Sequence, residues 1–183
     1  MKWALSDQKK LSTKQGFTVV ELLIVIAVIS ILAVLTIIAY GSIQTKARDT
    51  IVKNAAKQLG VELQRFAADT GKTPVQTGGG WGGLGTGFVS SQIVDSNYPL
   101  AIETVLVNGG YLPSGFTAGL PKNTKYNSSA YTLMLYACGA KYVIYFSLEA
   151  PTPDDTINFN NATTQCGNTA VTNYNMQGAY IFS

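Results

Sequence analysis

Hydrophobic and polar residues follow two different patterns in the N-terminal part of the chain. From Leu22 to Ala39 there is no charged residue, and a helix crosses a bilayer with roughly 20 apolar residues. Further on, apolar residues recur in steps of three and four, at Ile43, Ala47, Ile51 or Val52, Ala55, Leu59, Leu63 and Phe66. These patterns predict one long helix over 17–69, apolar on every face in its first half and amphipathic in its second.

The rest of the chain predicts a small head built on that amphipathic half. The helix should end near Asp69, because Gly71 supplies a left-handed cap and Pro74 prevents continuation. A glycine-rich loop follows over 77–87. A proline near its first turn and the Asn108-Gly109-Gly110 that closes it predict a short helix at 98–106. Segments rich in aromatic and branched residues predict strands at 130–136 and 141–148, and a last strand is expected at about 178–182. Antiparallel strands packed on a helix give an α+β fold.

One carboxylate lies in the apolar run. Glu21 is followed directly by the uncharged segment, and a charge at the centre of a membrane helix costs about 2.5–3.5 kcal/mol on insertion scales. Such a residue marks a functional site by default, the alternative being that Glu21 lies in water at the membrane interface.

The residues before Glu21 carry a processing signal. The leader 1–16 holds four lysines and one aspartate, and it ends in Gly16 just before Phe17. A secretory signal would have its small-residue cleavage site after the apolar run, and none is found there. The basic leader, Gly16, Phe17 and Glu21 as the fifth residue after the glycine resemble the class III signal of type IV prepilins.

The resemblance implies a division of the chain and a processing route. Residues 1–16 are then a leader peptide, 17–40 a transmembrane and filament-core helix, and 41–183 an extracytoplasmic pilin head. A prepilin peptidase cuts after Gly16 and methylates the amine of Phe17. Glu21 pairs with that amine on a neighbouring subunit. The implied partners are other pilin subunits, the peptidase, the pilus assembly machinery and the cytoplasmic membrane, with the assembled filament at the cell surface.

Composition narrows the function classes. The formal net charge is +3, but four of the lysines lie in the leader, and the remainder has nine basic and nine acidic residues. This balance does not support nucleic-acid binding, although a local basic patch is compatible with it. The chain has no histidine, which removes the commonest general base near neutral pH. We therefore expect a protein that is not an enzyme and needs no cofactor.

Three further features concern the head. Cys138 and Cys166 predict one disulfide if the head is exported, worth roughly 3–4 kcal/mol in the chain-entropy model, with two free thiols as the alternative. Asp154, Asp155 and Asn158 offer clustered oxygens, which Ca²⁺ prefers, and related pseudopilins bind calcium in a C-terminal loop. The simpler interpretation of these residues is a turn.

The sequence favours a structural subunit of a type IV pilus or pilus-like filament. Two alternatives stay open. Within the same class the chain is a minor pilin or a pseudopilin of type II secretion. Outside it, the chain is an adhesin or receptor module that keeps its helix as a permanent anchor and does not polymerise. Adhesion, motility, DNA uptake and secretion are all compatible with the filament interpretation.

Overall fold

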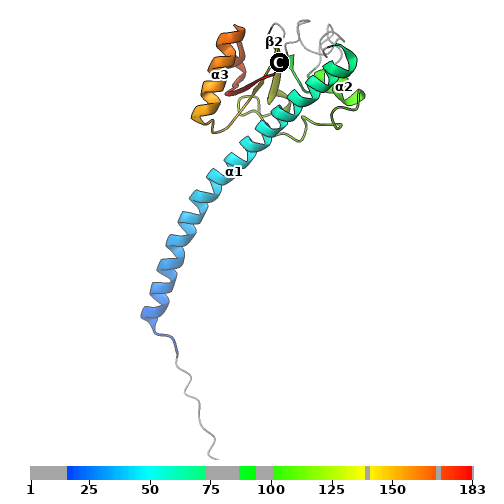
Figure 1. Cartoon of the computed structure of the whole chain (residues 1–183). Helices are drawn as coiled ribbons and strands as arrows, with labels where there is room; N and C mark the ends of the chain where they lie inside the picture. The colour runs from blue at the N-terminus through cyan, green and yellow to red at the C-terminus, as the bar shows by residue number, and fades with distance from the viewer. Residues whose placement is uncertain (1–15, 73–86, 94–100, 139–140, 168–169, 183) are drawn as a thin grey trace, which may run out of the picture. The chain divides into compact units, whose positions relative to one another are not determined.

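The long helix α1 spans Val19–Thr70 (Figure 1). The computed structural model describes residues 16–72, 87–93, 101–138, 141–167 and 170–182. The chain divides into two compact units, Met1–Gly41 and Ser42–Ser183. As predicted, α1 ends beside Gly71, which has a φ of +66°. Most of the predicted glycine-rich loop, including Trp81, lies outside the described residues.

A four-stranded antiparallel sheet forms the centre of the second unit. Its strands β1 (Gly87–Phe88), β2 (Leu133–Cys138), β3 (Lys141–Phe146) and β4 (Gly178–Phe182) follow one another in the order β1-β2-β3-β4. The α+β fold class and the last strand are thus as predicted. β2 begins later than predicted because 129–131 forms a 3₁₀ turn, in which Ser128 accepts a hydrogen bond from the amide of Ala130. The two-residue strand β1 was not predicted.

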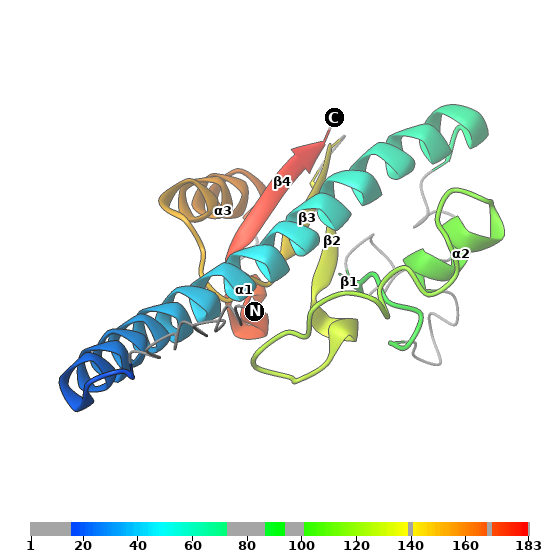
Figure 2. The ribbon, with the colours of Figure 1, turned by 90° about the horizontal axis from the view of Figure 1, so that it is seen from below.

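Alternate side chains of the sheet point into two separate cores. On one face, Leu135, Ile144 and Phe146 pack with the second half of α1. On the other face, Val143 and Tyr145 pack with residues of α3 (Pro153–Cys166) and of the turn at 170–174. Figure 2 shows α1 crossing the sheet and α3 lying on the side of β4. The sheet is therefore covered by helix on both faces.

The buried stripe of α1 is narrower than the sequence pattern predicted. Val52, Leu59 and Leu63 are at most 1% exposed, whereas Ile43 and Ile51 are 62% and 50% exposed. Of the two alternatives at 51 and 52, Val52 is therefore the core residue. The stripe begins this late because the head packs only against the last turns of the helix.

α3 replaces a turn that the sequence analysis expected. Thr152 caps the helix: its hydroxyl accepts from the amide of Asp155, whose carboxylate accepts from the amide of Thr152 in return. Pro153 occupies the first turn, where its missing N–H costs nothing. The prediction of a turn from aspartates and asparagines was wrong because these residues also cap and start helices.

The short helix α2 (Ile102–Asn108) begins later than the predicted 98–106, and its first expected residues lie outside the described range. The disulfide between Cys138 and Cys166 is confirmed, with Cα atoms 5.3 Å apart. It joins the end of β2 to the end of α3.

Candidate functional site

The first half of α1 has an almost uniformly apolar surface. Its large hydrophobic side chains are 50–76% exposed, and Phe17, two residues before the helix, is 88% exposed. The hydroxyls of Ser30 and Thr36 donate to backbone carbonyls of their own helix at 2.7 Å, so neither needs an outside partner. An 18-residue window of α1 reaches a mean hydropathy of 3.3, and by length and composition the helix is able to cross a membrane.

Glu21 closes the N-terminal turn of this helix. Its Oε2 accepts hydrogen bonds of 2.8 Å from both the amide and the hydroxyl of Thr18, and the Thr18 hydroxyl accepts from the amide of Glu21 at 3.2 Å. This reciprocal arrangement is a capping box. The sequence analysis missed it, although the signal is the Thr-x-x-Glu spacing of Thr18 and Glu21. Oε1 of Glu21 has no hydrogen-bond partner within the described residues.

Gly16 is not required by the fold of the described chain. A Cβ built on Gly16 meets no atom of the described residues within 4 Å. Thr18 caps the helix that begins at Val19, so only Phe17 lies between Gly16 and the cap residue. A requirement for glycine at this position would therefore come from outside the chain.

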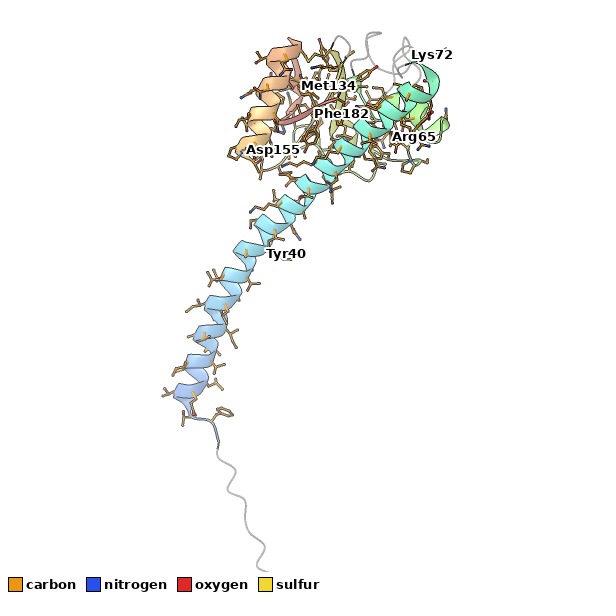
Figure 3. All side chains as sticks on the ribbon, viewed as in Figure 1. Tyr40, Arg65, Lys72, Met134, Asp155 and Phe182 are labelled. Carbon is orange, nitrogen blue, oxygen red and sulfur yellow. A yellow bond between two sulfur atoms is a disulfide. The ribbon has the colours of Figure 1, made fainter. Side chains whose placement is uncertain are left out.

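The calcium candidates do not form one set of ligands. Oδ2 of Asp155 accepts from Lys53 Nζ at 2.6 Å and from the amide and hydroxyl of Thr152 at 2.8 and 2.7 Å. Asp155 lies at the start of α3 (Figure 3). Asp154 is exposed, and Asn158 lines a different surface between α3 and β4. Among the described residues there is no cluster of three or more His, Cys, Asp or Glu side chains that could hold a metal ion.

Polar contacts fix α1 to the segment 149–155. Arg48 forms a bidentate ion pair with Glu149, with both N–O distances 2.7 Å. Asp49, 5% exposed, accepts from the amides of Glu149 and Ala150 at 2.8 and 2.9 Å. With Lys53 and Asp155 these residues form what we call the α1–α3 clamp. Asp49 and Lys53 have the i, i+4 spacing of a pair within a helix, but each has its partner in the segment 149–155 instead.

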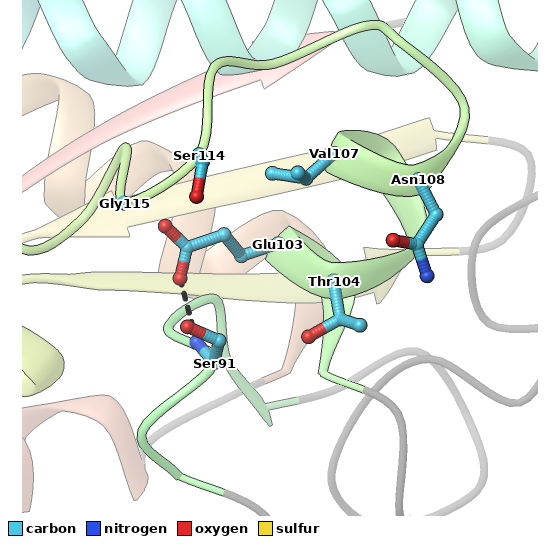
Figure 4. Close-up of a pocket in the computed structure, with 7 residues that line it drawn as sticks. All are labelled: Ser91, Glu103, Thr104, Val107, Asn108, Ser114 and Gly115. Carbon is cyan, nitrogen blue, oxygen red and sulfur yellow. Dashed lines mark hydrogen bonds between the residues drawn. The ribbon is translucent and has the colours of Figure 1, made fainter.

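Glu103 is a second buried carboxylate, 1% exposed. It accepts from the amides of Ser91 and Thr117 at 2.7 and 2.8 Å and from the Thr117 hydroxyl at 2.9 Å. Figure 4 shows it beside a hollow of about 190 Å³. Burial acts to raise the pKa of Glu103, but these hydrogen bonds outweigh burial and leave the pKa below its usual value. Glu103 therefore ties α2 to its neighbouring segments and is not free to act on a ligand.

Residues 11–37 match the family described as the prokaryotic N-terminal methylation motif. No curated protein and no solved structure was found to match the chain. The matched segment contains Gly16, Phe17 and Glu21, and with the α+β architecture it supports a pilin-like prepilin. The motif implies processing by a prepilin peptidase and assembly into pilus-type filaments. Proteins with this motif are structural rather than enzymatic.

Proposed function

We propose that the chain is a structural subunit of a type IV pilus or pilus-like filament, cut after Gly16 and assembled through helix 17–40. The observation that carries the proposal is the almost uniformly apolar, exposed first half of α1, most of which lies within the matched N-terminal methylation motif. Fully burying one Val, Leu or Ile side chain is worth about 1.5–3 kcal/mol. A helix with apolar residues on every face therefore needs lipid or copies of itself around it.

Glu21 supports the filament over a permanent anchor. Cleavage after Gly16 creates an ammonium at Phe17, and methylation preserves its charge. The capping box leaves Oε1 of Glu21 open, so the carboxylate can cap its own helix and accept from the amine of a neighbour at once. An unpaired buried charge costs about 3–5 kcal/mol. Subunits that enter in register are therefore favoured, and Glu21 sets the axial position during assembly.

The head is proposed to lie outside the cytoplasm. The Cys138–Cys166 disulfide favours an oxidising compartment. The protein would then be a single-pass protein of the cytoplasmic membrane before assembly and part of a cell-surface filament afterwards. Its partners would be other subunits, the prepilin peptidase, the assembly machinery and the membrane.

The N-terminus of the native protein tests this proposal. Mass spectrometry should find a mature chain that begins at methylated Phe17. Gly16→Val should leave the uncleaved precursor in the membrane and no surface filament, because the branched side chain blocks close approach of the backbone to the peptidase. The structure has room for this change, since a Cβ at Gly16 meets nothing.

Gly41→Val is the matched control, because a Cβ at Gly41 also meets nothing within 4 Å but lies far from the cleavage point. Normal cleavage of Gly16→Val would contradict the proposed processing. An intact leader on the native protein would favour the anchored adhesin or receptor. A methylated Phe17 on a protein that is only a trace component of purified filaments would indicate a minor pilin or a pseudopilin.

A further inference from the structure

The end of α2 contains the chain's only Asn-Gly pair, Asn108 and Gly109. Both residues are exposed, and Asn108 lines the hollow beside Glu103. Figure 4 shows Asn108 at the last turn of α2. Asparagine is a thermolabile residue, and its side chain is attacked most readily by the amide nitrogen of a following glycine, because a residue without a Cβ lets the backbone approach closely. The pair is therefore a candidate for spontaneous deamidation.

Deamidation at this pair needs no reactant except water. The amide nitrogen of Gly109 attacks Cγ of Asn108, the bond from Cγ to Nδ2 breaks, and ammonia leaves with the amide proton, so that a cyclic imide remains. Water then opens the imide at either of its two carbonyls. The product is aspartate or, where the main chain continues through the former side chain, isoaspartate. No electron is transferred, and neither an enzyme nor a cofactor is required.

The folded end of α2 opposes this attack. The attacking nitrogen of Gly109 donates a hydrogen bond to the carbonyl of Val105 at 3.1 Å, and the φ and ψ of Gly109, −81° and −5°, continue the helical turn. The next two amides also donate back into α2, at 3.0 and 2.9 Å. An amide held in a helix hydrogen bond cannot close the imide ring without breaking that bond. Deamidation of Asn108 therefore requires the last turn of α2 to open.

The ring of Tyr111 holds this turn closed. A Cβ built on Gly109 lies 2.7 Å from the Tyr111 ring, so the ring lies directly against the glycine and a side chain at position 109 would overlap it. The same ring packs edge-on against Phe66 of α1, with centroids 5.2 Å apart, and its hydroxyl donates to Asp69 at 3.1 Å. The last turn of α2 is thus held against α1, and it opens when the Tyr111 ring moves away.

We propose that Asn108 is a spontaneous deamidation site and that the contact between the Tyr111 ring and Gly109 controls its rate. Asn108 reacts only while the turn is open. The new carboxylate lies at the C-terminus of α2, where negative charge is unfavourable. Isoaspartate also adds a methylene to the main chain, so the bond from Gly109 to Val105 no longer forms in its original geometry. The modification is a one-way change that weakens the end of α2. This inference does not depend on the filament function.

The test follows deamidation of the full-length chain in detergent micelles at neutral pH and physiological temperature. Mass spectrometry of proteolytic digests gives the deamidated fraction of the peptide that contains Asn108. In denaturant this peptide should react at least about 10-fold faster than in the folded wild type, because unfolding removes both the hydrogen bond and the ring contact. Asn127 is the internal reference, since it is exposed but followed by serine. In denaturant its peptide should react more slowly than that of Asn108.

Variants of Tyr111 test the control by its ring. Tyr111→Ala should speed deamidation of Asn108 in the folded protein about 10-fold, which corresponds to about 1.4 kcal/mol of easier opening. Tyr111→Phe keeps the ring against Gly109 and should stay near the wild-type rate, which separates the ring contact from the hydrogen bond of the hydroxyl. Tyr126→Ala is the matched control, because Tyr126 is also half-buried and stacks on another tyrosine; it should leave the rate unchanged. If Tyr111→Ala loses the wild-type circular dichroism spectrum, Tyr111→Leu supplies the comparison and should give an intermediate rate.

The proposal is overturned if Asn108 in the denatured wild type reacts no faster than Asn127. Equal rates in the folded and the denatured wild type would show that the end of α2 gives no protection. Equal rates of wild type and a folded Tyr111→Ala variant would exclude control by the ring. If Tyr126→Ala also reacts faster, the rate reports a general loosening of the head, and the role assigned to Tyr111 is wrong.

Discussion

Asp155→Ala is the sharpest test of how α3 is held. Asp155 completes the capping box of α3 with the cap residue Thr152 and is also the partner of Lys53, and its side chain is 8% exposed. Loss of a helix cap costs about 1 kcal/mol. The ion pair is half-buried, with the Lys53 side chain 24% exposed, so its loss should cost about 1–2 kcal/mol, between the values for exposed and buried pairs. We expect the free energy of unfolding to fall by about 2–3 kcal/mol.

Urea unfolding of the full chain in micelles, followed by tyrosine circular dichroism, measures this change. The midpoint should fall by about 1–2 M at a typical slope for a small domain. Asp154→Ala is the matched control: Asp154 is exposed, next in sequence and also in the first turn of α3. It should cost only about 0.3–1 kcal/mol through the helix dipole. Equal effects of the two substitutions would refute the assigned role of Asp155.

A double-mutant cycle separates the ion pair from the cap. Lys53→Met and Asp155→Asn should show a coupling energy of about 1–2 kcal/mol, because the residues are in direct contact. A coupling energy near zero would mean that loss of the capping hydrogen bonds alone explains the loss of stability when Asp155 is replaced. The same variants address the calcium candidate. If calcium stabilised wild type but not the Asp155→Asn variant, the interpretation of Asp155 as a purely structural residue would be wrong.

Three other predictions follow from the described contacts. Burial acts to raise the pKa values of Glu103 and Asp155, but hydrogen bonds to both carboxylates and the Lys53 ammonium beside Asp155 leave them below their usual values. The two carboxylates should therefore stabilise the fold above about pH 4, and this stabilisation should be lost as the pH falls through their lowered folded-state pKa values. An acid titration of the unfolding free energy that shows no loss below about pH 4 would contradict this. Reducing the Cys138–Cys166 bond should cost about 2–5 kcal/mol, measured by urea unfolding with and without reductant, whereas two titratable thiols in the unreduced, denatured native protein would refute the bond. Glu21→Ala should still be inserted and cut after Gly16 but should form fewer filaments, counted by electron microscopy in a strain with only this copy; wild-type numbers would exclude Glu21 as the residue that sets register.

The elements that were predicted best are those with a strong local signal. The end of α1 depends on the glycine cap at Gly71, and the last strand is a short apolar segment with two aromatic residues; both signals act over a few positions. The two-residue strand β1 has no such signal, because it is defined only by pairing with β2. α3 was missed since its polar, asparagine-rich sequence is typical of turns, and its stability depends on Asp155, Lys53 and burial of Phe159.

The residues of the candidate site likewise fall into two groups, those with a local sequence signal and those defined only by contacts distant in sequence. Gly16, Phe17 and Glu21 could be proposed from the sequence because the signal they form depends on spacing along the chain, and the matched motif covers all three. The clamp contacts join residues about one hundred positions apart. Helix spacing alone would pair Asp49 with Lys53, four residues away, whereas tertiary partners that the sequence does not reveal bind both.

The α1–α3 clamp has a mechanical consequence for a protein that is pulled along its helix. Tension in α1 enters the head at Arg48, Asp49 and Lys53, and all their partners lie between 149 and 155. That segment is inside the covalent loop closed by Cys138 and Cys166. If the clamp contacts break, only the chain between Cys138 and Cys166 can extend, because the disulfide keeps the end of β2 attached to the end of α3. Oxidised heads should therefore extend in a short first step under force, and reduced heads should unravel further.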